Sequence, residues 1–211
     1  MTAQHLYPKL QAYCDTLTKE FKLIPIERKA KLTRLAAYLS DQFQTGQMPQ
    51  LIVICTHNSR RSHLGQVWLA ISAHYYNLPA IATFSGGTEA TAFYPSAVAA
   101  LRKIGVVVDC ADTRAANPVY QLSWKTNSTP YQAFSKSYTT APNPQDSFGA
   151  ILVCTAADEA CPIVEGANFR MALPFEDPKA FDGTAQESQK YEERSRQIGR
   201  ELLFTMSQVQ Q

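Results

Sequence analysis

Residues 51–70 read LIVICTHNSRRSHLGQVWLA, and this stretch decides the fold. Its first four residues are wholly apolar, which is typical of a strand buried on both faces of a parallel sheet. From Ser62 to about Tyr76 the apolar side chains recur at helical spacing. A buried strand that leads through a polar loop into a helix predicts the beginning of an α/β domain.

The rest of the chain continues the alternation of strands and helices. We expect further strands near 80–84, 148–153 and 169–173, and helices over 95–104 and 185–206. The segment Ser85-Gly86-Gly87 is expected to form a turn. The predicted fold class is therefore α/β, with a central four-stranded parallel sheet flanked by helices.

Two segments fall outside this alternation. Residues 1–48 carry apolar stripes at helical spacing on both sides of Pro25, which predicts an N-terminal helical extension that packs on the main domain. A dimer interface or an active-site lid is the alternative for these helices. Residues 49–211 would form the α/β domain, and 114–147 would be an insertion within it that resembles a β-hairpin.

The composition excludes several classes of function. The net charge of +2, without a Lys/Arg-rich run, argues against a nucleic-acid partner. The longest apolar runs are too short to cross a bilayer, so we expect no membrane association. The N-terminal residues lack the apolar core of a secretory signal, so a cytoplasmic location is expected. Reduced cysteines follow from that location.

The chemistry is predicted to lie in the loop from Cys55 to Ser62. A loop that curls into a helix N-terminus directs several backbone N–H groups at one point, which favours binding of a tetrahedral oxyanion. A thiolate at Cys55 would be stabilised there and would act as the nucleophile. Arg61 can bind two oxygens bidentately, Ser62 can donate a hydrogen bond to the thiolate, and Asn58 can brace the loop. The predicted oxyanion-binding residues are Thr56, His57, Asn58, Ser59, Arg60, Arg61 and Ser62.

Three further side chains are predicted at the same rim of the sheet, because they follow later strands and ligands bind beyond the carboxyl ends of parallel strands. Cys154 ends the third strand, and Cys161 follows it after six residues. Cys154 could attack a substrate adduct on Cys55, and Cys161 could then resolve the product of that attack. Two cysteines without a catalytic role near a loop would show the same sequence pattern. Asp177 follows the fourth strand and is a candidate general acid.

The remaining cysteines and the histidines of the loop receive simpler interpretations. Cys14 and Cys110 are expected to be structural. His57 and His63 flank the loop without ligand spacing to another His or Cys, so we predict no metal and interpret both as tuning the local charge.

Taken together, these residues resemble the low-molecular-weight protein tyrosine phosphatase superfamily and, within it, the thioredoxin-coupled arsenate reductases. The resemblance spans about 50–206. It rests on the loop Cys55–Ser62, on Phe84-Ser85-Gly86-Gly87 followed by Pro95, on Cys154 and Cys161 with Pro162-Ile163 after them, and on Asp177-Pro178.

The resemblance implies a reaction. Cys55 would attack arsenate, Arg61 and the loop amides would bind the oxyanion, and Asp177 would protonate the departing oxygen. Cys154 would attack the adduct with release of arsenite, and the resulting Cys154–Cys161 disulfide would be reduced by a thioredoxin-like partner. No cofactor is expected, and Gln66 replaces the acidic residue that helps to hold a potassium ion in some of these reductases.

Two other functions remain open at this point. The same site without the relay would make a low-molecular-weight protein tyrosine phosphatase, which hydrolyses a phosphomonoester through a cysteinyl-phosphate. A non-catalytic oxyanion or redox sensor is the third hypothesis, with residues 1–48 or 114–147 as the partner surface. Arsenate, phosphate or a phosphoester is thus the expected small-molecule partner.

Overall fold

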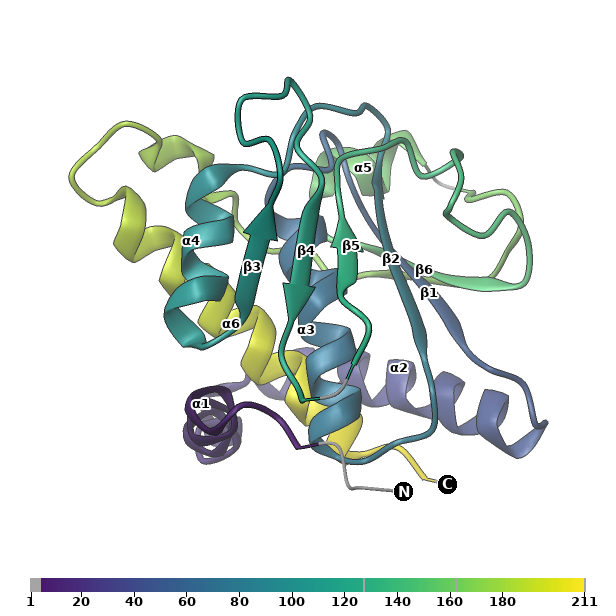
Figure 1. Ribbon diagram of the computed structural model, residues 1–211. Helices are drawn as coiled ribbons and strands as arrows, with labels where there is room; N and C mark the ends of the chain where they lie inside the picture. The colour runs from purple at the N-terminus through teal and green to yellow at the C-terminus, as the bar shows by residue number, and fades with distance from the viewer. Residues whose placement is uncertain (1–4, 127, 162, 211) are drawn as a thin grey trace.

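The computed structural model describes residues 5–126, 128–161 and 163–210 (Figure 1). The central sheet has four parallel strands, as predicted from the sequence, and their order is β2-β1-β6-β7. These strands are β1 (Gln50–Cys55), β2 (Ala82–Gly87), β6 (Phe148–Leu152) and β7 (Ala167–Ala172). Cys55 lies opposite Gly87 in β2, and Ile54 lies opposite Leu152 in β6. The carboxyl ends of the strands therefore form one rim.

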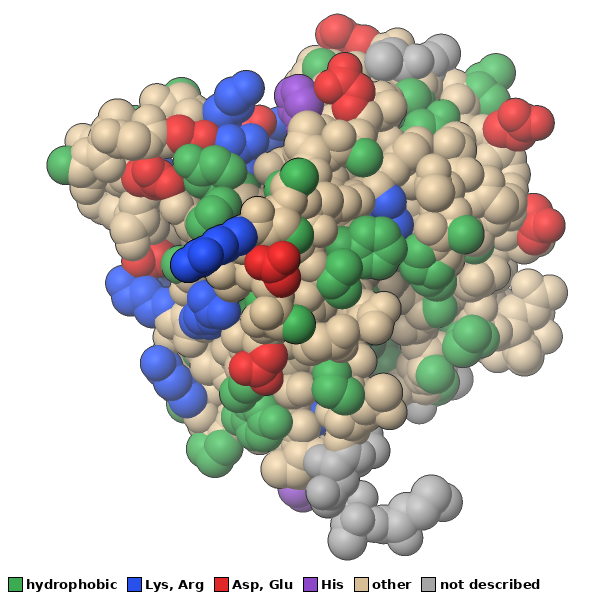
Figure 2. All heavy atoms as spheres, turned by 45° about the horizontal axis from the view of Figure 1, so that its top comes forward, with side chains coloured by type: hydrophobic (Ala, Val, Ile, Leu, Met, Phe, Trp, Pro, Cys, Tyr) green, Lys and Arg blue, Asp and Glu red, His purple; other side chains and the backbone are tan. Residues whose placement is uncertain are grey.

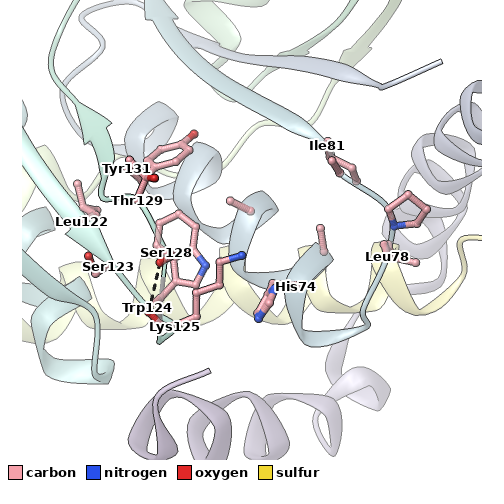
Figure 3. Close-up of a pocket in the computed structure, with 14 residues that line it drawn as sticks. His74, Leu78, Ile81, Leu122, Ser123, Trp124, Lys125, Ser128, Thr129 and Tyr131 are labelled. Carbon is pink, nitrogen blue, oxygen red and sulfur yellow. Dashed lines mark hydrogen bonds between the residues drawn. The ribbon is translucent and has the colours of Figure 1, made fainter. Parts of the chain in front are cut away.

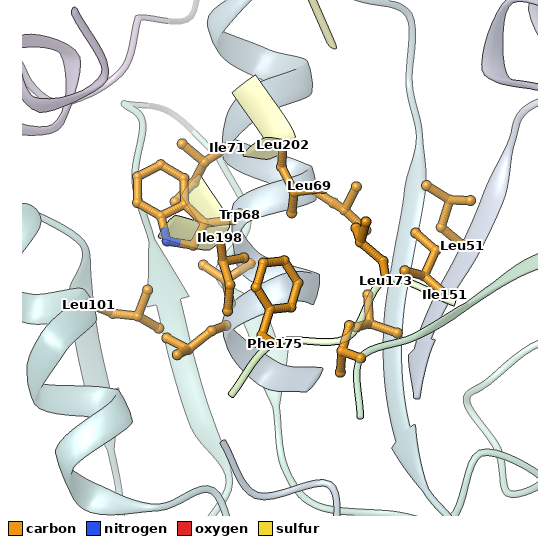
Figure 4. Packing of buried hydrophobic residues seen from close by; sticks show 14 of the residues in the cluster. Leu51, Trp68, Leu69, Ile71, Leu101, Ile151, Leu173, Phe175, Ile198 and Leu202 are labelled. Atoms are coloured by element: carbon orange, nitrogen blue, oxygen red, sulfur yellow. The ribbon is translucent and has the colours of Figure 1, made fainter. Parts of the chain in front are cut away.

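The helices of the α/β domain pack on the sheet and on one another. α3 (Arg61–Tyr75) follows β1 and contacts β1, β2 and α6 (Glu187–Ser207), while α4 (Pro95–Ile104) also packs on α6. A Cβ atom at Gly199 would lie 2.6 Å from the ring of Trp68, so glycine is needed where α6 crosses α3. Figure 4 shows Trp68 and Ile198 at this crossing, with Phe175 beside them in the core.

The N-terminal segment forms two helices, as predicted, with a short 3₁₀ turn between them (η1, Phe21–Leu23). Both α1 (Pro8–Thr18) and α2 (Ile26–Gln44) contact α6. Their fully buried side chains, Leu10, Leu17, Leu32, Leu35 and Leu39, join the core of the rest of the chain. Arg28 in α2 forms a 2.7 Å ion pair with Glu201, whose side chain is 2% exposed. The proposed boundary at residue 48 stays a prediction.

The insertion contains the expected hairpin as part of a separate antiparallel sheet. Strands β4 (Tyr120–Ser123) and β5 (Tyr131–Ala133) pair with each other, and β3 (Val107–Cys110) pairs with β4. Figure 1 shows this three-stranded sheet beside the central sheet, in front of α3. The strand that follows α4, β3, thus pairs with the hairpin and completes the three-stranded sheet.

Residues after β5 run along the end of β2. Gly87 donates a backbone hydrogen bond of 2.9 Å to Lys136, and Tyr138 donates one of 3.0 Å to Gly87. The expectation of a turn at Ser85–Gly87 is wrong: these are the last residues of β2, because β1 pairs with them on one side and the insertion on the other. A Cβ atom at Gly86 would lie 2.4 Å from Cα of Tyr138, which explains the glycine.

Two short elements complete the rim. α5 (Thr155–Ala160) follows β6, and a 3₁₀ helix (η2, Pro178–Phe181) follows β7. Pro162, which contributes to the family resemblance, lies outside the described residues. Within the described ranges, no helix combines the length and apolar character that a membrane span requires.

Candidate active site

The loop between β1 and α3 is built around Cys55 and Ser62. Their Sγ and Oγ atoms lie 3.0 Å apart, and the side-chain amide of Asn58 donates a 2.9 Å hydrogen bond to the same Oγ. Because the amide occupies the oxygen as an acceptor, the hydroxyl proton of Ser62 is free to point at the sulfur. Asn58 has φ of 43°, a left-handed conformation that Asn tolerates better than most residues. The local sequence thus supplies both the curl of the loop and a donor for a thiolate.

The insertion holds this loop from outside. The backbone N–H of Lys136 donates a 2.8 Å hydrogen bond to Oδ1 of Asn58, which is fully buried. Ser135 Oγ donates to the carbonyl of His57 over 3.3 Å and accepts the N–H of Thr91 over 2.8 Å. Ser135 and Lys136 were not identified from the sequence, and nothing in their local pattern distinguishes them from other polar hairpin residues.

The end of β2 supports the loop on its other side. Thr88 and Glu89 donate backbone hydrogen bonds to the carbonyls of Cys55 (3.1 Å) and Thr56 (2.8 Å). A Cβ atom at Gly87 would lie 2.6 Å from the Thr56 carbonyl oxygen and 2.7 Å from the Asn58 nitrogen. Only glycine fits between the two segments, so the second of the paired glycines noted in the sequence has a direct steric role.

Arg61 and Asp177 face each other across the mouth of the loop. The guanidinium of Arg61 forms an ion pair with the Asp177 carboxylate and donates a 2.7 Å hydrogen bond to the carbonyl of Phe175. The other carboxylate oxygen of Asp177 accepts the N–H of Lys179 over 3.0 Å, which caps η2. Asp177 therefore lies at the predicted rim, with its charge compensated by Arg61.

The two adjacent arginines point to different carboxylates. Arg60 donates to Asp182 over 2.5 Å and to the hydroxyl of Tyr191 over 2.6 Å, and its guanidinium stacks 4.2 Å from the ring centroid of Tyr94. Burial first, and then the hydrogen bond to Asp182, raise the pKa of Tyr191, which therefore stays a neutral partner. Asp182 thus compensates the charge of Arg60.

The hollow enclosed by these groups is small. It has a volume of about 10 Å³, roughly the room that one water molecule needs. It is lined by Cys55, Thr56, His57, Ser59, Arg60, Arg61 and Asp177. Arg61, whose guanidinium pairs with Asp177, is one of the side chains that line it. Figure 2, tilted to bring the carboxyl rim forward, shows side chains of both charge signs on this face rather than a continuous basic patch.

Cys154 lies beside the loop, as predicted. It caps the N-terminus of α5, where its Sγ accepts the N–H of Ala157 over 3.4 Å and lies 3.5 Å from Thr56 Oγ1. Cys161 follows α5 directly, and both thiols are buried and free. The structure thus brings Cys154 next to the residue that follows Cys55 and places Cys161 at the opposite end of a short helix.

The two histidines of the loop differ in environment. His57 is partly exposed, with Nε2 3.8 Å from the carboxylate of Glu89. His63 is fully buried and stacks on Phe93 at 4.0 Å between ring centroids. Burial, followed by the nearby ammonium of Lys136, lowers the pKa of His63 to about 3. His63 is therefore uncharged near neutral pH, and the expectation that it tunes the local charge is wrong.

Lys136 is itself an unusual residue for a core position. It is 5% exposed, and its ammonium donates to the carbonyl of Phe134 over 3.4 Å and lies 4.7 Å from the centroid of the Phe134 ring. Burial lowers the pKa of Lys136 to about 8.

Among the described residues, no three His, Cys, Asp or Glu side chains are grouped so that they could hold a metal ion.

A larger cavity lies away from this site. It has a volume of about 620 Å³ and lies between the end of α3 and the hairpin, where Trp124 and Tyr131 line one side and Leu78 and Ile81 the other (Figure 3). Leu78 and Ile81 precede β2, whereas the candidate site lies at its carboxyl end. A six-residue strand spans roughly 20 Å. The cavity is therefore separate from the rim.

Comparisons with known proteins agree on the fold. No protein-family model matches the chain, and no curated protein matches it. A low-molecular-weight phosphotyrosine phosphatase from Vibrio cholerae O395 superposes with a TM-score of 0.50 at 13% sequence identity, over 74% of this chain and 93% of that chain. A mutant of YwlE from Bacillus subtilis superposes with a TM-score of 0.53 at 15% identity, over 76% and 97%.

A thioredoxin-dependent arsenate reductase from Corynebacterium glutamicum also matches, with a TM-score of 0.43 at 17% identity, over 94% of this chain and 96% of that chain. At these identities the likeness concerns the fold alone. The chain has the fold of the low-molecular-weight protein tyrosine phosphatases, as the sequence predicts.

Proposed function

We propose that this protein is a cysteine-nucleophile oxyanion enzyme that reduces arsenate to arsenite through Cys55, Cys154 and Cys161. The observation that carries the proposal is the 3.5 Å contact between Cys154 Sγ and Thr56 Oγ1. This contact supports the proposal because Thr56 directly follows Cys55, the proposed nucleophile. Hydrolysis of a phosphoester needs no such thiol, whereas reduction of arsenic needs two electrons from a pair of thiols.

In the first step the oxyanion would take the place of Asp177 as the partner of Arg61. The guanidinium fork matches two oxygens of a tetrahedral anion, and the backbone N–H groups of the loop bind the others. The Cys55 thiolate, which Ser62 stabilises, then displaces one oxygen of arsenate. Asp177, released from Arg61, acts as the general acid, and the oxygen leaves as water.

In the second step Cys154 completes the two-electron reduction of arsenic, in which the two thiols together are oxidised to one disulfide. Its thiolate attacks the Cys55 sulfur of the thio-arsenate, so that a Cys55–Cys154 disulfide forms and the S–As bond breaks. The bonding electrons go to arsenic, which leaves as arsenite, reduced from As(V) to As(III). Cys161 then attacks Cys154, and Cys55 departs as a free thiolate.

A reductant must complete the cycle, because the Cys154–Cys161 disulfide would otherwise accumulate. We propose a thioredoxin-like dithiol protein for this role, since a dithiol exchanges with a disulfide through a mixed-disulfide intermediate. Ile163, close to Cys161 in the chain, is 83% exposed and would lie on the surface that such a protein approaches.

Hydrolysis of an aryl phosphate is the second candidate function. It would use Cys55, Arg61 and Asp177 with water in place of Cys154. The observation that favours it is the partly exposed ring of Tyr94, which stacks on Arg60 and Tyr191 near the residues that line the hollow and could contact an aromatic leaving group.

Mass spectrometry distinguishes these functions. The reduced protein is exposed to arsenate for one turnover, and the disulfides are mapped by peptide analysis. The proposal predicts arsenite together with a Cys154–Cys161 disulfide in the wild type, neither product in Cys55→Ser, and a trapped Cys55–Cys154 disulfide in Cys161→Ser. Cys110→Ser, which removes a partly exposed thiol outside the site, is the matched control and should behave as the wild type.

Each alternative leaves a different result. If arsenate leaves every thiol free while p-nitrophenyl phosphate is hydrolysed in a reaction that depends on Cys55, the protein is a phosphatase. If neither reaction occurs although phosphate binds with measurable affinity, the site is a sensor rather than an enzyme.

A further inference from the structure

We propose that Arg170 is a positioning residue that holds α5 intact and thereby keeps Cys161 away from Cys154 until the relay requires it. The inference rests on the proposed relay, because it assigns a role to the segment between the two relay cysteines. Arg170 lies on β7, outside both the oxyanion loop and the residues that would contact substrate.

Among the described residues, the guanidinium of Arg170 makes four hydrogen bonds, to Asp158 near the middle of α5 and to Cys161 directly after it. Its Nε and Nη2 atoms donate to the carbonyl of Cys161 over 3.1 and 2.9 Å. Nη2 also donates to the backbone carbonyl of Asp158 over 3.0 Å and to its carboxylate over 2.5 Å. One guanidinium thus binds both the end of the helix and an acidic side chain within it.

The contacts satisfy carbonyls that a short helix leaves without partners. The last carbonyls of any helix accept no hydrogen bond from within the helix, and the helix dipole favours a cation near them. α5 has six residues, too few to be stable by itself. Arg170 therefore supplies a substantial part of what keeps α5 folded.

An intact α5 separates the two thiols. Cys154 and Cys161 are seven residues apart, and a rise of 1.5 Å per residue puts their Cα atoms roughly 10 Å apart along a helix. A disulfide requires a Cα separation below about 7 Å. The helix must therefore unwind before Cys161 can attack Cys154, and unwinding removes the carbonyls from Arg170.

The consequence is an energy difference between the two redox states. The dithiol state keeps the four contacts of Arg170, whereas the disulfide state loses some or all of them. Arg170 should therefore raise the reduction potential of the Cys154–Cys161 pair and slow its closure. The pair would remain reduced until a Cys55–Cys154 disulfide makes closure favourable.

The test measures the redox equilibrium of the Cys154–Cys161 pair directly. Proteins that carry Cys55→Ser, so that the nucleophile cannot compete, are equilibrated with glutathione and glutathione disulfide at a series of ratios. The disulfide fraction is then mapped by mass spectrometry. Glutathione disulfide is the oxidant: it gains the two electrons and leaves as two thiols. Arg170→Gln should shift the equilibrium constant toward the protein disulfide by roughly tenfold, which corresponds to a potential about 30 mV lower.

Two further variants distinguish this role of Arg170 on α5, called the latch below, from a general loss of charge or structure. Arg34→Gln is the matched control, because Arg34 borders the same shallow cavity as Arg170 but stacks on Phe169, 5.3 Å from its ring centroid, instead of binding α5. It should leave the potential unchanged. Asp158→Asn should shift the potential in the same direction as Arg170→Gln but by less, because the two backbone carbonyls keep their donor.

The outcomes distinguish this proposal from the proposed function. Equal potentials for wild type and Arg170→Gln overturn the latch, even if arsenate reduction proceeds. A shifted potential supports it, even if arsenate produces no disulfide, since the measurement uses no arsenate. A shift of equal size in Arg34→Gln also overturns the latch, because the effect would then reflect lost charge on this surface.

Discussion

The backbone amide of Lys136 donates a 2.8 Å hydrogen bond to the side-chain oxygen of Asn58, 78 residues earlier in the chain. The insertion is thereby part of the candidate active site, because Asn58 in turn donates to Ser62, which faces the Cys55 sulfur. A segment that interrupts the α/β alternation therefore supports the loop from Cys55 to Ser62.

This relationship predicts opposite effects for two substitutions. Asn58→Ala removes both side-chain hydrogen bonds and leaves the buried Lys136 N–H unpaired, which should destabilise the protein by about 1–3 kcal/mol and weaken phosphate binding. Lys136→Met keeps the backbone hydrogen bond and removes a buried ammonium, so it should increase the free energy of unfolding at pH 7 by about 1 kcal/mol or more.

Urea unfolding and phosphate titration calorimetry measure these two effects. The role assigned to the insertion fails if Lys136→Met weakens phosphate binding as much as Asn58→Ala, since the side chain rather than the backbone would then support the loop.

The ion pair of Arg61 with Asp177 predicts that a substitution at Asp177 strengthens phosphate binding but slows turnover. Asp177→Asn should bind phosphate more tightly, because the carboxylate no longer competes for the guanidinium. It should also lower kcat by a factor of about 10² or more, because the general acid is lost. Glu176→Gln is the matched control, since Glu176 pairs with Arg194 and its side chain is 91% exposed. Weaker phosphate binding in Asp177→Asn would contradict the competition.

Gly87 should tolerate no side chain. A Cβ atom there would lie 2.2–2.7 Å from backbone atoms of Thr56, Asn58 and Glu89, so Gly87→Ala should displace the loop and lower the free energy of unfolding by about 1–3 kcal/mol. Loss of oxyanion binding should accompany it. Gly46→Ala is the control: it has φ of +71° but open space around it, so it should cost about 1 kcal/mol and leave binding intact. Unchanged phosphate affinity in Gly87→Ala would show that the loop can shift without consequence.

His63 predicts a pH dependence of stability. Its pKa of about 3 in the folded protein lies below its ordinary value of 6.5, so the unfolded chain binds a proton that the folded protein excludes. The contribution is fully present above pH 6.5 and is lost as the pH falls toward 3, at about 1.4 kcal/mol per pH unit. His63→Phe, which can keep the stacking on Phe93, should show a shallower slope of unfolding free energy between pH 6 and 4. Identical slopes would mean that His63 takes up a proton inside the fold.

The sequence by itself determined those parts of the candidate site whose residues lie close together in the chain. The apolar run before Cys55, the helix after Arg61 and the spacing to Ser62 lie within a few consecutive residues, so local geometry suffices to form the loop. The alternation of strands and helices, with right-handed connections, predicts a parallel sheet, and the rim of that sheet brings in Cys154 and Asp177.

Only the tertiary structure decided which side chains meet across the rim. Two consecutive arginines select different carboxylates, Asp182 for Arg60 and Asp177 for Arg61. No local pattern specifies this choice, because it depends on the phase of α3 against loops that follow more than 100 residues later. The same holds for Lys136 at the loop and Arg170 at Cys161. Their contacts pair buried or partly buried polar groups from different elements, which leaves no hydrophobic period in the sequence from which they could be predicted.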